Sequence, residues 1–201
     1  PVVTKVGEKD LMAPVINYGV KIMSLGFLMN KSDVVIWRGP MASNALIQLI
    51  EDTLWGELEF LVIDMPPGTG DIAITLAQKL PQAKALIVIT PQQMAVADGR
   101  KAASMFKANG IQIPILGVVE NMSWFTPEKH PDEKYLLFGQ GGGEQLSKEL
   151  QVPVLAKIPL VSDVCELGDT GKTVFASSNK IVSEVFSGLA HLIAEGSEVL
   201  I

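Results

Sequence analysis

The sequence has few cysteines, charged residues and aromatic residues and no long apolar run, and these absences exclude several classes of protein. Cys165 is the single cysteine in 201 residues, so no disulfide can form within the chain, and we expect a cytoplasmic protein. No run of about 18 apolar residues occurs, which argues against a membrane span. Charged residues make up only 19% and aromatic residues 6%, whereas 48% are hydrophobic. Enough apolar surface is therefore available to offset the entropy of ordering, which excludes a disordered chain.

A surplus of basic residues is also absent. There are 16 Lys and Arg against 22 Asp and Glu, which gives a formal net charge of −6. Proteins that bind nucleic acid by neutralising its phosphates carry a basic surplus. We therefore expect no nucleic-acid partner, and the lack of a long apolar run leads us to expect no membrane partner.

Short apolar runs alternate with amphipathic stretches, a pattern typical of parallel strands connected by helices. We predict strands at residues 34–37, 60–63, 85–90, 114–120 and 154–158. Helices are predicted at 45–54, 95–107, 144–150 and 180–194, and a further helix is predicted to begin at Asp71. The start of the chain is less regular, with one possible strand at 21–26. The sequence predicts an α/β fold: a single domain over residues 1–201 with a doubly wound, mostly parallel sheet in three layers.

Asp64 follows the predicted strand 60–63 and precedes a turn-rich segment. Ligands of open α/β sheets bind at the carboxyl ends of the strands, where a Mg²⁺–phosphate site needs a hard oxygen ligand. The turn Gly68-Thr69-Gly70 would let backbone N–H groups approach a γ-phosphate. The alternative is a turn without a ligand, in which Asp71 caps the next helix through its side chain.

The phosphate-binding sequence Gly-x-x-x-x-Gly-Lys-[Ser/Thr] occurs nowhere in the 201 residues. The segment 168–173 is only superficially similar, because three residues separate Gly168 from Lys172 and no convincing strand precedes it. We interpret this segment as a surface turn.

Six segments occur in the order and spacing of one known family: residues 37–41 (WRGPM), 64–71 (DMPPGTGD), 90–92 (TPQ), 118–123 (VVENMS), 138–143 (FGQGGG) and 165–169 (CELGD). The chain resembles the Mrp/ApbC family of iron–sulfur cluster carrier ATPases, which are P-loop NTPases of the MinD and ParA type. The resemblance extends from about Pro14 to Ile193. The chain looks like a member that begins just after the P-loop and the switch I aspartate.

The resemblance implies ATP and Mg²⁺ as cofactors. Asp64 matches the aspartate that orders Mg²⁺ through water. The segment 66–71 matches switch II, which senses the γ-phosphate, so that Gly68, Thr69, Gly70 and Asp71 would take part in catalysis. Because the P-loop lysine is missing, we expect ATP hydrolysis in a full-length protein and not by this chain alone.

The resemblance also implies which residues bind the nucleotide base. Asn121 matches the asparagine that hydrogen-bonds adenine, and Pro159 and Leu160 match the segment against the adenine edge. Arg38 belongs to an Arg-Gly-Pro turn typical of the family. The alternatives stay open. Without the resemblance, a turn-forming asparagine at a strand end is the better interpretation of Asn121, and a surface arginine paired with a helix carboxylate is an equal alternative for Arg38.

The chain departs from the family in its cysteines. Many members carry a Cys-x-x-Cys pair between the segments 118–123 and 138–143, and two protomers hold one cluster with four thiolates. Here residues 124–135 contain no cysteine, and a lone loop histidine such as His130 is more often solvated than a ligand. Cys165 would give a symmetric dimer two thiolates, unless it is simply a small apolar residue. An iron–sulfur cluster held in the family's manner is therefore doubtful, and Cys165 is the candidate ligand.

The function implied is that of an ATP-dependent iron–sulfur cluster carrier, a homodimer that serves iron–sulfur apoproteins. One alternative is a MinD/ParA-like positioning ATPase. It would need an amphipathic membrane helix or a basic surface, whereas the tail 194–201 is short and acidic. The other alternative is a catalytically silent interaction module without a P-loop.

Overall fold

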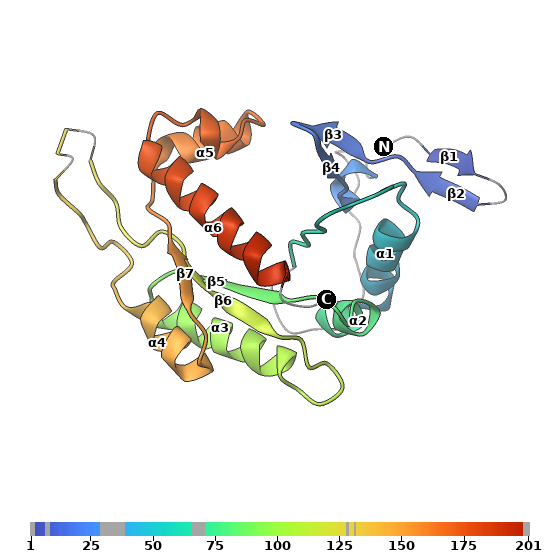
Figure 1. The fold of residues 1–201 in the computed structure, drawn as a ribbon, viewed down its shortest axis with the longest axis horizontal. Coiled ribbons are helices and arrows are strands. Elements are labelled where there is room, and N and C mark those ends of the chain that lie inside the picture. The colour runs from blue at the N-terminus through green and yellow to red at the C-terminus, as the bar shows by residue number, and fades with distance from the viewer. Residues whose placement is uncertain are drawn as a thin grey trace. The chain divides into compact units, whose positions relative to one another are not determined.

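The computed structural model describes residues 3–6, 9–28, 39–65, 71–127, 129–130 and 132–198 (Figure 1). These residues divide into two compact units, Pro1–Leu80 and Pro81–Ile201, and each unit is described by itself. The single domain expected from the sequence stays a prediction. Among the described residues, no helix combines the length and apolar character that a membrane crossing requires.

The second unit is built on a parallel sheet. Strands β5 (Ala85–Ile89), β6 (Ile115–Glu120) and β7 (Val154–Lys157) pair in the order β5-β6-β7. Both pairs are parallel, so the three carboxyl ends lie at one edge of the sheet. The strands are nearly continuous runs of apolar residues, as expected where a parallel sheet is covered on both faces. Val118 and Val119 in β6 are 0% and 1% exposed.

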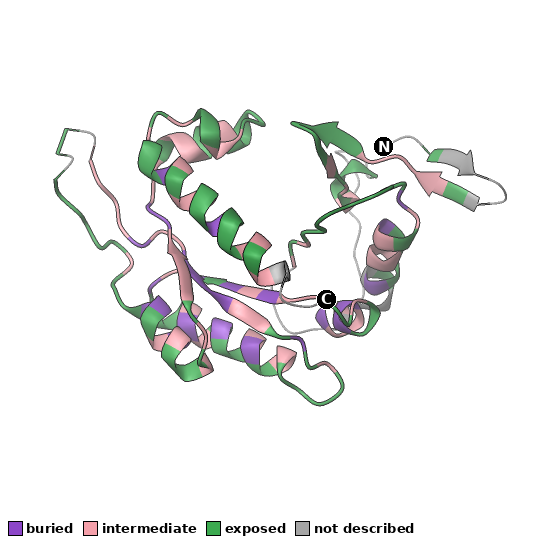
Figure 2. Ribbon diagram, in the orientation of Figure 1, coloured by how far each residue is buried: buried purple, intermediate pink, exposed green. Residues whose placement is uncertain are grey.

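Helices cover both faces of this sheet (Figure 1). On one face, α3 (Gln93–Phe106) and α4 (Gly142–Leu150) contribute Val96 and Leu146 to a core with Ile87, Ile89 and Val118. On the other face, α6 (Lys180–Glu198) packs Leu189 against Val119 and Ile158. Figure 2 shows the buried residues concentrated on the strands and on the helix surfaces that face them. This three-layer arrangement confirms the predicted α/β fold class.

The first unit contains two hairpins and two helices. Strands β1 (Val3–Val6) and β2 (Lys9–Met12) are antiparallel, as are β3 (Val15–Asn17) and β4 (Val20–Ile22). A short 3₁₀ turn, η1 (Leu25–Phe27), follows β4. Helices α1 (Gly39–Glu51) and α2 (Asp71–Lys79) pack together, and their buried side chains include Leu49, Ala73, Leu76 and Ala77. The possible strand at 21–26 is thus replaced by the end of β4 and the η1 turn.

The predicted strand at residues 60–63 is wrong. These residues pair with no strand in the described part of the chain. The side chains of Phe60, Leu61 and Val62 are 49%, 41% and 90% exposed. A strand is held by hydrogen bonds to a neighbouring strand, so an apolar sequence without a neighbour stays irregular. The predicted strand at 34–37 lies outside the described residues.

Most other predicted elements are confirmed, although the helix predicted at 45–54 spans Gly39–Glu51 instead. The helix predicted at 144–150 begins at Gly142, and the last helix continues to Glu198. Helix α5 (Ser162–Asp169) was not predicted, and η2 (Val174–Ala176) follows it. Gly168 lies in α5, and the exposed residues 170–172 form the turn after it.

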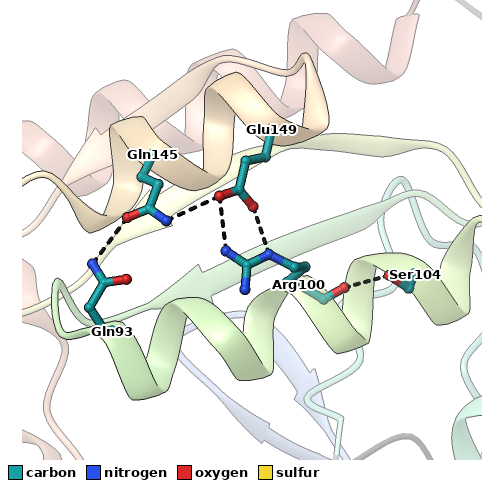
Figure 3. Close-up of polar contacts among 5 residues, drawn as sticks. All are labelled: Gln93, Arg100, Ser104, Gln145 and Glu149. Atoms are coloured by element: carbon teal, nitrogen blue, oxygen red, sulfur yellow. Dashed lines mark hydrogen bonds and ion pairs between the residues drawn. The ribbon is translucent and has the colours of Figure 1, made fainter.

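Polar side chains join the exposed surfaces of α3 and α4 (Figure 3). The Arg100 guanidinium donates through Nε and Nη2 to the two carboxylate oxygens of Glu149, at 2.7 and 2.9 Å. Gln145 donates to the same carboxylate at 3.1 Å and accepts from Gln93 at 3.0 Å. The hydrogen bond from Arg100 is the main reason why the pKa of Glu149 falls from its ordinary value of 4.5 to about 2.

This pair predicts a pH-dependent contribution to stability. A lowered carboxyl pKa stabilises the fold above the unfolded value near 4.5, and the contribution disappears as the pH falls toward about 2. Thermal unfolding of Arg100→Gln should give a lower Tm than the parent chain at pH 7, and the difference should shrink as the pH is lowered from 4.5 toward 2. Lys148→Gln removes the same charge from an exposed position of α4 and is the control. A difference that stays constant down to pH 2 would contradict the assignment.

Candidate functional site

The candidate site lies at the carboxyl edge of the parallel sheet. There the chain leaves β5 at Thr90, β6 at Asn121 and β7 at Ile158. Backbone hydrogen bonds hold these exits together: Asn121 N donates to the Ile89 carbonyl at 2.7 Å, and Ile158 N donates to the Glu120 carbonyl at 2.9 Å. Ligands of parallel α/β sheets bind at this edge.

Two of the predicted base-binding segments run side by side at this edge. Ser123 N donates to the Ile158 carbonyl at 2.9 Å, and Leu160 N donates to the Trp124 carbonyl at 2.7 Å. A parallel bridge between Phe125 and Leu160 continues the pairing. Pro159, between these hydrogen bonds, is buried. The structure thus brings the Asn121 turn and the Pro159–Leu160 segment together, while their binding of a base stays a prediction.

The Asn121 side chain is half-buried and oriented by its own turn. Its Oδ1 accepts from Met122 N at 3.0 Å, and Met122 has a left-handed φ of 55°. The buried Ser123 hydroxyl closes the turn by donating to the Glu120 carbonyl at 2.8 Å. These bonds fit a turn-forming asparagine. They also leave the amide nitrogen with no partner among the described residues, so that it can donate to a ligand.

Glu120, which the sequence analysis did not single out, is the charged residue buried beneath this turn. Its side chain is 2% exposed. Its Oε2 accepts from Gly143 N at 2.6 Å, and Lys157 Nζ lies 3.7 Å from its Oε1. Lys157 also bonds Glu144, which lowers the pKa of Glu144 and raises that of Lys157. A charged residue that ends an apolar strand is the only sequence signal of this arrangement.

The glycines of the segment 141–143 allow this close packing at the start of α4. A Cβ atom at Gly142 would lie 2.3 Å from the Pro91 carbonyl oxygen, and one at Gly143 would lie 2.9 Å from Glu120 Oε2. Gly141 precedes the helix with a φ of 80°. Contacts with the ends of β5 and β6 therefore explain Gly142 and Gly143, and the left-handed φ explains Gly141.

The predicted phosphate side of the site is described only in part. Asp64 is exposed in an irregular segment of the first unit, and Asp71 begins α2, with its side chain not described. Arg38, Gly68, Thr69 and Gly70 lie outside the described residues. Asp64 and Asn121 belong to different units, so their mutual arrangement stays a prediction.

The loop after Asn121 forms a short antiparallel arm. Phe125 and Tyr135 exchange backbone hydrogen bonds at 2.9 and 2.8 Å, and Lys134 Nζ lies 4.5 Å from the centroid of the Trp124 ring. His130 is exposed near its end, with Nδ1 3.5 Å from a Glu133 carboxylate oxygen. Within the described ranges, no three or more His, Cys, Asp or Glu side chains gather as a metal site would require. Cys165 is exposed on α5.

Comparison with known proteins identifies the family. The family model ParA, described as NUBPL iron-transfer P-loop NTPase, matches residues 2–194. The chain belongs to this family. The resemblance seen in the sequence is thereby confirmed.

Two curated relatives and one solved structure are similar to this chain. An iron–sulfur cluster carrier protein of Synechocystis sp. is 45% identical over 88% of this chain and 49% of its own length. One from Pseudomonas fragi is 44% identical over 92% and 64%. A nucleotide-binding protein from Archaeoglobus fulgidus, solved in complex with ADP, has a TM-score of 0.65 and 31% identity, covering 85% of this chain and 64% of its own. The chain therefore spans about half to two thirds of the length of these proteins.

The contact between Gly142 and Pro91 predicts a large difference between two Gly→Ala substitutions. Gly142→Ala should lower the free energy of unfolding by about 1–3 kcal/mol, because its Cβ would overlap the Pro91 carbonyl. Gly188→Ala in α6, where nothing lies within 4 Å of the added atom, should raise it by about 0.5–1 kcal/mol. Urea unfolding measures both. Equal effects would contradict the packing described at the start of α4.

Proposed function

We propose that the chain acts in ATP-dependent delivery of iron–sulfur clusters and that the carboxyl edge of β5–β7 binds the adenine base. The observation that carries the proposal is the pairing of the Asn121 turn with the segment 158–160 at that edge. Family membership and the ADP complex of the Archaeoglobus protein support it.

Asn121 suits recognition of adenine by its two kinds of polar atom. Its amide nitrogen donates and its Oδ1 accepts, and the oxygen has a second lone pair beside the bond from Met122 N. Adenine offers an N6 amino donor next to ring-nitrogen acceptors, and an asparagine amide matches such a pair. Guanine carries a carbonyl oxygen in place of the N6 amino group. The Asn121 oxygen would then face another acceptor, so ATP should bind better than GTP.

Asp64 is the proposed Mg²⁺ residue. Mg²⁺ keeps several waters and usually takes one or two carboxylates together with the phosphate oxygens. An exposed carboxylate therefore fits a cation held through water. Bound Mg²⁺ would neutralise charge on the phosphates, and Asp64 would orient its water shell, with residues 68–71 as the proposed switch II. The proposal assigns hydrolysis only to a protein that also carries a phosphate-binding loop.

The iron–sulfur cluster is cargo in this proposal, and apoproteins that need a cluster are the proposed partners. Each chain offers one thiolate, that of the exposed Cys165. A symmetric homodimer would supply two, and other ligands would have to complete the shell of a cluster that usually has four cysteines. A cluster on this chain should therefore be labile.

Base recognition predicts that Asn121→Ala changes the preference between nucleotides. The dissociation constant for ATP should rise roughly tenfold, equivalent to about 1.4 kcal/mol and close to the value of one hydrogen bond, while that for GTP changes less than about twofold. NMR titration of the labelled 201-residue chain measures both. Asn109→Ala removes an exposed turn asparagine after α3 and is the control. Equal losses for ATP and GTP would refute the role of Asn121.

The cluster proposal predicts a dependence on Cys165. Anaerobic reconstitution with iron and sulfide should give a substoichiometric cluster, and Cys165→Ser should abolish its visible charge-transfer band, because no other cysteine is present. His130→Ala in the exposed loop is the control and should leave the band unchanged. A band that survives Cys165→Ser and disappears in His130→Ala would place the ligand in the loop instead.

A further inference from the structure

Glu120 is the charged side chain that the described structure buries most completely, with 2% of its surface exposed. Burying a carboxylate is costly unless hydrogen bonds and an opposite charge compensate for the lost water. Both are present: Gly143 N donates to Oε2 at 2.6 Å, and Lys157 Nζ lies 3.7 Å from Oε1. The N-terminus of α4 adds the favourable end of a helix dipole.

The position of Glu120 in the chain makes this contact more than a helix cap. The residue ends β6 and directly precedes Asn121, and the loop that starts at Asn121 returns to the sheet at Gly141–Gly143. The bond from Gly143 to Glu120 therefore fastens together the two ends of this loop. Through Lys157 the same carboxylate also contacts the last residue of β7, directly before the segment 158–160.

The residues that contact Glu120 thus surround the turn that carries Asn121. The Glu120 carbonyl accepts from Ile158 N at 2.9 Å and from the Ser123 hydroxyl at 2.8 Å, while its carboxylate binds the start of α4. A substitution that releases the carboxylate would free the start of α4 and remove the charge beside Lys157. The turn would lose support on two sides at once.

We propose that Glu120 is a positioning residue: its buried carboxylate, bound to Gly143 N and facing Lys157, holds the 121–123 turn in the geometry that recognises the nucleotide base. The proposal rests on the proposed function, because base recognition is what the turn is held for. It adds a residue that contacts no nucleotide and acts through Asn121.

Amide hydrogen exchange of the 201-residue chain tests the holding role without any nucleotide. In Glu120→Ala, the Asn121 and Ser123 amides should exchange at least about tenfold faster than in the parent chain, after normalisation to the Val118 amide in the middle of β6. Glu120→Gln keeps an acceptor oxygen for Gly143 N and should stay within about threefold of the parent. Equal acceleration at Val118 and at the turn would mean general destabilisation and would overturn the proposal.

A second variant addresses the same contact from the other side. Gly143→Ala places a Cβ 2.9 Å from Glu120 Oε2 and should displace the carboxylate, so that it reproduces the exchange pattern of Glu120→Ala. It keeps the test decisive if Glu120→Ala does not fold. Gly168→Ala, where nothing lies within 4 Å of the added atom, is the matched control and should leave the turn amides unchanged.

NMR titration with ATP and GTP then tests the link to base recognition. In folded Glu120→Ala or Gly143→Ala, the ratio of the GTP to the ATP dissociation constant should fall toward one, and Glu120→Gln should preserve it. An unchanged ratio in variants with fast turn exchange would overturn the link. If the parent chain shows no shift of residues 121–125 or 158–160 with millimolar ATP, the proposed function fails. The exchange comparison then still decides whether Glu120 holds the turn.

Discussion

Strand β6 has to satisfy hydrogen-bonding partners on two sides and side-chain packing on two faces. Its backbone pairs with β5 and β7, and Val118 and Val119 point into the cores beneath α3–α4 and beneath α6. A strand so enclosed has no freedom to shift its register, because a slip of one residue would exchange the residues in the two cores. The end of β6, and with it the position of Glu120 and Asn121, follows from this constraint.

The elements that the sequence predicts well are those that pack into the hydrophobic core. In β5 and β6, runs of apolar residues indicate buried strands. In α3, the helical spacing of apolar residues indicates the buried face, where Val96 and Ala103 are both fully buried. The fold class could therefore be predicted from these residues. Placement of Asn121 beside 158–160 could be expected from the family resemblance.

Other features depend on partners that a local pattern does not contain. Residues 60–63 have the composition of a buried strand, yet the first three are exposed, and no described strand runs beside them. The hairpins of residues 3–22 have strands of three or four residues, too short to show a clear alternation. These hairpins also make tertiary contacts, such as the hydrogen bond from Met12 N to the Asp52 carbonyl at 2.7 Å. Glu120 is hidden from sequence reasoning for a related reason, because its partners lie 23 and 37 residues further along.

Three of the segments that carried the family resemblance meet at one place in the structure. Pro91 belongs to the first, Glu120 to the second, and Gly142 and Gly143 to the third. Gly142 is required because the Pro91 carbonyl leaves no room for a Cβ, and Gly143 because the Glu120 carboxylate approaches its backbone. A motif match is often taken as a set of ligand-binding residues, but here these positions are explained by packing contacts within the chain. Asn121 differs from these residues. Backbone hydrogen bonds hold its main chain at the edge, while its side-chain amide nitrogen has no partner among the described residues. The residues named from these three segments therefore pack the ends of β5 and β6 against the start of α4, and in the proposed function the ligand is recognised by the side chains that this edge presents.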